Sequence, residues 1–215
     1  MNMKRKKIHQ EPKKAMLIVT STEAEALYFS QMRKDCRYTN LTVRWAEHAD
    51  SLESLISIAA KLRTAGKFDS VWALYGFDAF EATLDQLRSA LETARIKKIG
   101  LAWNNPGLPL WYLLHIQTPR LPITDNKVIE NSLRGHLPKF SSGSEYLLNE
   151  GSSLHLKLFP LKAQAVVNAG TYNSLVERRN GGLQATNMVK LLNEITSYCG
   201  LADVSHNQKL IGLKK

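Results

Sequence analysis

The chain has 215 residues, of which 44% are hydrophobic and 22% are charged, a composition that excludes a largely disordered protein. Its 29 Lys and Arg residues outnumber its 19 Asp and Glu residues, and the formal charge of +10 favours a polyanionic partner, with nucleic acid as the leading candidate. The sequence has no run of 18 or more apolar residues and opens with charge where a secretory signal would become apolar. We therefore expect a cytoplasmic protein with no membrane contact.

The N-terminal stretch is strongly basic and lacks an apolar face, so residues 1–14 are expected to form a basic flexible tail. Two interpretations stay open here: a solvated tail that aids solubility, or an arm that binds nucleic-acid phosphates. The candidate nucleic-acid-binding residues are Lys4, Arg5, Lys6, Lys7, Lys13 and Lys14.

Strand-like apolar runs alternate with helical patterns over the first half of the chain. The expected strands cover residues 15–20, 41–47, 70–75 and 96–104, and the expected helices cover 21–34, 50–66 and 80–94. This alternation predicts a parallel sheet with right-handed crossovers. We expect a doubly wound α/β core over residues 15–116.

The pattern changes beyond Pro106. A short apolar helix is expected in LPLWYLLHI, and a proline-bearing connection follows it. Further helical spacing occurs in VIENSLRGHL, over residues 162–179 and in ATNMVKLLNEITSYCG. These segments predict a helical extension packed on the core over residues 117–200, with a C-terminal tail over 201–215.

Ligands of an open parallel sheet bind beyond the carboxyl ends of its strands, so the residues after each expected strand are candidates for a site. The acids found there are Glu23, Glu25, Glu47, Asp78 and Glu81. A magnesium site for phosphodiester chemistry gathers two or three carboxylates, because the hard cation prefers oxygen ligands. Each Glu is equally explained by helix N-terminal charge preference or surface exposure, and Asp78 by a turn or a helix cap.

Other site chemistries find little support in the sequence. No glycine-rich phosphate loop follows any expected strand, so no nucleotide cofactor is implied. Cys36 and Cys199 are too few and too far apart for a zinc site, and we expect two free thiols. His115 closes the apolar helix, where a packing histidine is the alternative to a ligand or a base.

Several segments, in order along the chain, resemble RloB-like proteins, a bacterial family related to the Toprim fold and associated with restriction and phage-defence loci. LIVTSTEAEALYF is similar to the family's strand followed by EGxxTExxYF, with Glu25 in a matching place. VWALYGFD corresponds to a strand that ends in DxD, and WNNPGLPLWYLLH resembles NPxFExWxLLH, with His115 retained. HLPKFSSG and ATNMVKLL resemble later motifs. The resemblance implies a Toprim-like doubly wound parallel sheet of about four strands with a helical C-terminal extension.

The departures from the family pattern fall on the positions that would carry metal-dependent nuclease chemistry. Thr20 stands where the family has its strand-one Glu, the expected general acid or base, and Gly76 replaces the first Asp of DxD. Pro109 takes the place of a Glu, and Ser142 the place of a basic residue. Asp78 is thus the survivor of an acidic pair, and the resemblance implies a degenerate catalytic set.

Three hypotheses follow. In the first, a catalytically degenerate RloB-like protein of a phage-defence or restriction-associated system binds nucleic acid or a partner protein, by resemblance an ATPase from the same locus, and needs no cofactor. In the second, a rebuilt site makes an active Mg²⁺-dependent Toprim-like nuclease. Its catalytic residues would be Asp78, Glu25 and His115, and its metal ligands Asp78, Glu23 and Glu47. In the third, the helical second half docks a protein and the basic tail only aids solubility.

Overall fold

A computed structural model of the chain describes residues 14–179, 183–210 and 212. Of the predicted tail, only Lys14 falls within that part. The other candidate tail residues, Lys4, Arg5, Lys6, Lys7 and Lys13, lie outside the described residues.

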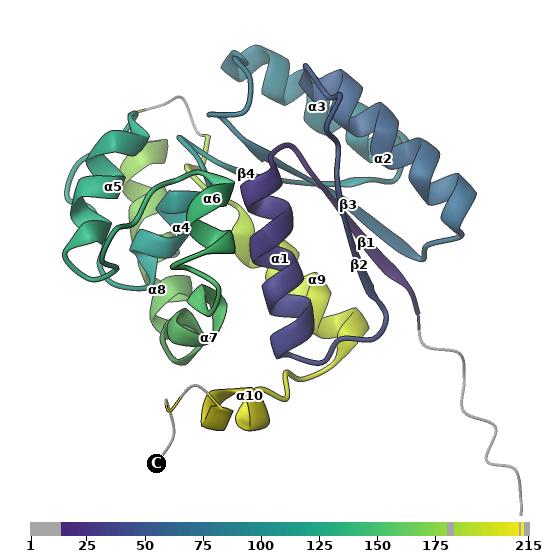
Figure 1. Cartoon of the computed structure of the whole chain (residues 1–215). Coiled ribbons are helices and arrows are strands. Elements are labelled where there is room, and N and C mark those ends of the chain that lie inside the picture. Colours follow the sequence, from purple (N-terminus) through teal and green to yellow (C-terminus); the bar gives the residue numbers. More distant parts are fainter. Residues whose placement is uncertain (1–13, 180–182, 211, 213–215) are drawn as a thin grey trace, which may run out of the picture.

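Four parallel strands form a single sheet in the order β2-β1-β3-β4 (Figure 1). The strands are β1 (Met16–Thr20), β2 (Leu41–Trp45), β3 (Ser70–Gly76) and β4 (Gly100–Asn104). All five residues of β1 are buried, as expected for a strand covered on both faces, which explains why the apolar runs were continuous rather than alternating. The predicted α/β fold with a Toprim-like, doubly wound parallel sheet is confirmed.

Three helices connect the strands, namely α1 (Glu23–Asp35), α2 (Leu52–Gly66) and α3 (Leu84–Ile96). Each begins after a hydroxyl side chain that accepts a hydrogen bond from a backbone N–H of the first turn: Thr22, Ser51 and Thr83. Residues 96–99, expected at the start of the fourth strand, instead end α3 and turn back to the sheet. The strand therefore begins at Gly100.

The chain after β4 is helical, as predicted, with more short elements than periodicity indicated. Its helices are α4 (Leu108–Leu114), α5 (Asn126–Arg134), α6 (Ser144–Leu148), α7 (Leu154–Leu158), the 3₁₀ turn η1 (Phe159–Leu161), α8 (Lys162–Glu177), α9 (Met188–Cys199) and α10 (Ser205–Leu210). Both α6 and α7 have five residues, too few to show a helical repeat in the sequence. The division of the chain into a core and an extension stays a prediction.

Two hydrophobic clusters cover the two faces of the sheet. Leu17 and Val19 of β1 pack with α2 and α3, whereas Met16 and Ile18 pack with α1 and the helices that follow β4. Figure 1 shows α2 and α3 together on one side of the sheet, with α1 and α9 on the other. The helical second half thus shares a core with one face of the sheet.

The outer edge of β4 is covered by residues 184–187 rather than left open. Asn187 accepts a hydrogen bond from Trp103 N at 2.7 Å through Oδ1 and donates one to Leu101 O at 2.9 Å through Nδ2, as a neighbouring strand would. Across the described part of the chain, the helices are all too short or too polar to cross a membrane.

Candidate functional site at the carboxyl edge of the sheet

Glu25 lies in the first turn of α1 and closes a capping box with Thr22. Its Oε2 accepts hydrogen bonds from Ser21 N at 3.0 Å, Ser21 Oγ at 2.9 Å and Thr22 N at 3.0 Å, while Thr22 Oγ1 accepts from Glu25 N. A reciprocal box of this kind satisfies backbone donors that the helix itself leaves unpaired. One carboxylate oxygen of Glu25 therefore has a structural role.

The other carboxylate oxygen of Glu25 has no such role. The residue is 1% exposed, and its Oε1 is buried without a hydrogen-bond partner. Burial raises the pKa of Glu25 to about 8, against the hydrogen bond from Thr22 and with a further upward contribution from the charge of Asp78. At neutral pH the side chain is therefore mainly protonated, a state unlike that of a ready metal ligand.

Asp78 follows β3 and turns its carboxylate back toward the end of the sheet. A Cβ atom at Gly76 would overlap Asp78 Oδ1 and would lie 3.1 Å from Glu25 Oε1, and a Cβ atom at Gly107 would overlap Asp78 Oδ2. The carboxylate thus occupies the space that a side chain at Gly76 would need. Among the predicted acids, Glu25 and Asp78 both lie against Gly76.

Asn126, at the start of α5, completes the surroundings of Asp78. Its Nδ2 donates a hydrogen bond to Asp78 Oδ2 at 2.6 Å, and its own Oδ1 is buried without a partner. Although Asp78 remains exposed as a residue, desolvation of its carboxylate raises the pKa above the ordinary value, and the bond from Asn126 opposes this shift. Our sequence analysis missed Asn126, which comes from 48 residues along the chain.

Thr20 ends β1 and Ser21 follows it, and both residues are buried and hydrogen-bonded. Thr20 Oγ1 donates to Thr22 O at 2.9 Å, so the hydroxyl at the position where the resemblance implies a Glu stabilises a turn. Ser21 Oγ accepts a hydrogen bond from Gly76 N at 3.1 Å while it donates to Glu25, and so joins the ends of β1 and β3. Ser21 was also missed as a site residue, although its place directly after a strand was a signal for it.

Two clefts meet at Asp78. The larger, of about 760 Å³, also includes Glu81 and Asp125, and the smaller, of about 250 Å³, includes Glu23 and Ser142. Glu47 follows the edge strand β2 and lines neither of them. Within the described residues, no group of three or more His, Cys, Asp or Glu side chains is placed to hold a metal ion.

His115 lies away from these clefts. It is buried, its Nδ1 donates to Trp111 O at 2.8 Å, and burial lowers its pKa to about 4. It lines a different pocket together with Cys36 and His155, and that pocket has no residue in common with the two clefts at Asp78. The predicted catalytic histidine is therefore a neutral side chain separate from the acidic pair.

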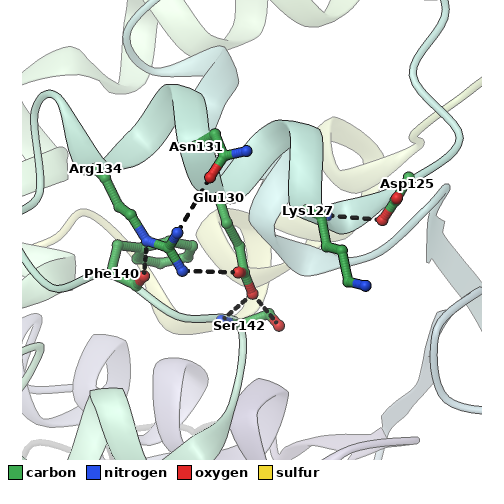
Figure 2. Close-up of polar contacts among 7 residues, drawn as sticks. All are labelled: Asp125, Lys127, Glu130, Asn131, Arg134, Phe140 and Ser142. Carbon is green, nitrogen blue, oxygen red and sulfur yellow. Dashed lines mark hydrogen bonds and ion pairs between the residues drawn. The ribbon is translucent and has the colours of Figure 1, made fainter.

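The family resemblance implies a basic residue at position 142, and Figure 2 shows that the Ser142 found there is bound by an acid. Its N and Oγ donate to Glu130 Oε1 at 2.9 and 2.7 Å. Arg134, from the same helix α5, donates to Glu130 Oε2 at 3.2 Å and to Phe140 O at 3.0 Å. Glu130 is thus satisfied by Arg134 and Ser142, and the loop before α6 is fixed without a free cation at this position.

A family model described as "RloB-like protein" matches residues 16–195 of the chain. Among curated proteins and among solved structures, no match was found. The matched range runs from the first residue of β1 into α9 and includes every residue of the site described above.

Proposed function

Because the chain belongs to the RloB-like family, we propose that it serves in a bacterial phage-defence or restriction-associated system, and that it binds nucleic acid or a partner protein there without cleaving a phosphodiester. The proposed binding role is based on the family assignment together with the net positive charge of the chain. A formal charge of +10 favours a polyanion, with counterion release as the source of affinity. An ATPase from the same locus is the protein partner that the family resemblance suggests.

The proposal that the protein is not a nuclease depends on the protonation of Glu25 and on the small number of carboxylates around Asp78. Metal-dependent phosphodiester cleavage needs ionised oxygen ligands that gather around one or two cations. Here Gly76 supplies no ligand, Thr20 is committed to a turn, and Glu25 holds a proton at neutral pH. Asp78 is the one remaining acid of the family's DxD position.

A metal-binding and cleavage experiment tests this function directly. Mg²⁺ and Mn²⁺ are titrated by calorimetry into the wild type and Asp78→Ala, and the same samples are incubated with plasmid DNA and with RNA. We expect no cleavage and no metal binding that depends on Asp78. Cleavage by the wild type that is lost in Asp78→Ala would overturn the proposal.

One observation favours a second candidate, a Mg²⁺-dependent nuclease with a rebuilt site. Glu25 Oε1 and Asn126 Oδ1 are both buried without partners, and both belong to residues around the Asp78 carboxylate. These oxygens suit a hard cation, so Glu25, Asp78 and Asn126 are the residues that would hold it. A bound Mg²⁺ would supply charge neutralisation for a phosphate, and the pair would first have to release the proton on Glu25.

Glu25→Gln separates the two candidates, because glutamine can keep the capping box but cannot ionise. If a cation binds through this pair, the glutamine variant loses metal binding while its folding is preserved. If the pair is only structural, the wild type and Glu25→Gln give the same flat titration. A calorimetric signal in the wild type that vanishes in both Asp78→Ala and Glu25→Gln would support the nuclease.

A further inference from the structure

Three successive connections into the sheet carry a basic residue in the left-handed backbone conformation. Arg37, Lys67 and Lys98 have φ angles of 56°, 51° and 56°, and they lie between α1 and β2, between α2 and β3, and between α3 and β4. Glycine is the favoured residue at such a position after a helix, since a Cβ atom makes this conformation less favourable. Backbone conformation alone therefore does not explain why all three positions have Lys or Arg instead of glycine.

Stabilisation of the helix ends does not explain the choice either. A cation near a helix C-terminus interacts favourably with the macrodipole, but the last turns already contain basic residues in ordinary helical conformation. These are Arg33 and Lys34 in α1, Arg63 in α2 and Arg95 in α3. Arg37, Lys67 and Lys98 therefore add positive charge that is not needed to stabilise the helix C-termini.

Parallel topology collects these residues at one edge of the sheet. Every connection from a helix into a parallel strand arrives at the amino ends of the strands, so the three residues lie along the edge opposite Asp78. One contact supports this placement: Arg63 Nη1, in the last turn of α2, donates to Lys97 O, in the connection after α3, at 3.4 Å. In Figure 1 the chain enters β1 at this same edge.

Several acids at this edge already have hydrogen-bond or ion-pair partners. Asp69 accepts a hydrogen bond from Ala15 N at 2.7 Å, and Glu92 pairs with Arg95. Asp203 pairs with Arg37 at 3.6 Å. By contrast, Lys67 and Lys98 are exposed, and neither is in an ion pair with any residue that the structure describes.

We propose that this amino edge, defined by Arg37, Lys67, Lys97 and Lys98, binds the phosphate backbone of nucleic acid on the side of the sheet opposite the acidic pair. The proposal rests on the nucleic-acid branch of the proposed function and assigns its surface. Arg37 precedes β2 and Lys98 precedes β4, the two outer strands, so the cations span the whole edge. With neighbouring strands about 4.8 Å apart, the edge is roughly 15 Å wide, which suits several phosphates of one strand.

Glycine substitutions test the amino edge without harm to the backbone, because glycine accepts the left-handed conformation. Lys67→Gly/Lys98→Gly in the full chain removes two charges from the amino edge. The control, Lys127→Gln/Lys139→Gly, also removes two lysines, and Lys139 has a positive φ of 62° but lies before α6, paired with Glu150. Fluorescence anisotropy with a labelled DNA duplex and a labelled single-stranded RNA, from about 50 to 200 mM salt, measures affinity and its salt dependence.

We expect the amino-edge variant to lose on the order of tenfold in affinity, and the slope of log affinity against log salt to fall in magnitude by about two. The control should stay within about twofold of the wild type, because it changes net charge equally but at other places. Unchanged binding by the amino-edge variant, or an equal loss in the control, overturns the assignment while the wild type still binds. No binding by the wild type would instead overturn the nucleic-acid branch itself.

A membrane surface is the competing polyanion. The same proteins are therefore mixed with phosphatidylcholine vesicles that contain phosphatidylserine. Vesicle binding that falls in the amino-edge variant while nucleic-acid binding does not would overturn the assignment in favour of a lipid surface.

Discussion

The two edges of the sheet differ in the solvent exposure of their charged side chains. At the carboxyl edge, Glu25 is buried, the carboxylate of Asp78 is partly desolvated although it lines two clefts, and the buried oxygens Glu25 Oε1 and Asn126 Oδ1 lack partners. At the amino edge, Lys67 and Lys98 stand in solvent without ion pairs to described residues. The family resemblance implies chemistry at the first edge, whereas our proposal assigns nucleic-acid binding to the second. Under this proposal, the fold keeps its strand order while the functional edge of the sheet changes.

A carboxylate introduced at position 76 should have the largest effect on the carboxyl edge. In Gly76→Asp the new side chain would overlap the Asp78 carboxylate and crowd a third acid against Glu25. Without metal, we expect a loss on the order of 4 kcal/mol in the free energy of unfolding, measured by urea denaturation.

Two variants separate the charge from the overlap. Gly76→Ala adds bulk without charge and should cost less than Gly76→Asp. Gly76→Asp/Asp78→Ala frees the space and should recover most of the stability. If Gly76→Asp were as stable as the wild type, the Asp78 carboxylate could not occupy the place that the structure gives it.

A pH series sharpens the comparison, because Glu25 should make stability depend on pH at the carboxyl edge. Its pKa is about 8 in the folded protein and near 4.5 when unfolded, so the folded state retains a proton that the unfolded state has lost between these values. Stability should therefore fall as pH rises from about 4.5 to about 8, by on the order of 3 kcal/mol from this group. Urea denaturation at about pH 5 and about pH 8 measures the loss.

Glu25→Gln is the matched control for the pH series, since it keeps the hydrogen-bond acceptor of the capping box and removes the ionisation. Its stability should vary less with pH than that of the wild type, with other titrating groups common to both. Parallel pH profiles for the two proteins would mean that Glu25 is ionised in the folded state.

The sequence predicted the frame of the fold but not the inner arrangement of the site. The four parallel strands were predicted from their strand-like apolar runs, because that signal is local in the sequence. The position of the Asp78 carboxylate was not predictable in this way, because it depends on an absent Cβ at Gly76 and on Asn126 from a distant helix. The amino edge could not be predicted either, because the rule for ligand sites in parallel sheets and the family motifs both indicate the carboxyl edge, and the left-handed backbone at Arg37, Lys67 and Lys98 has no local sequence signal.

The smallest expected effect concerns the backbone of the amino edge. Lys67→Gly/Lys98→Gly should change the free energy of unfolding by less than about 1 kcal/mol, because relief of the left-handed conformation offsets the greater freedom of glycine in the unfolded chain. Lys67→Val is the contrasting variant: a β-branched residue at a φ of 51° is unfavourable, and we expect a loss of about 2 kcal/mol. If Lys67→Val were as stable as Lys67→Gly/Lys98→Gly, the backbone of Lys67 would not be in the left-handed conformation. The difference matters for function, because a loss of nucleic-acid binding in a glycine variant of native stability can be assigned to the missing charge rather than to a damaged fold.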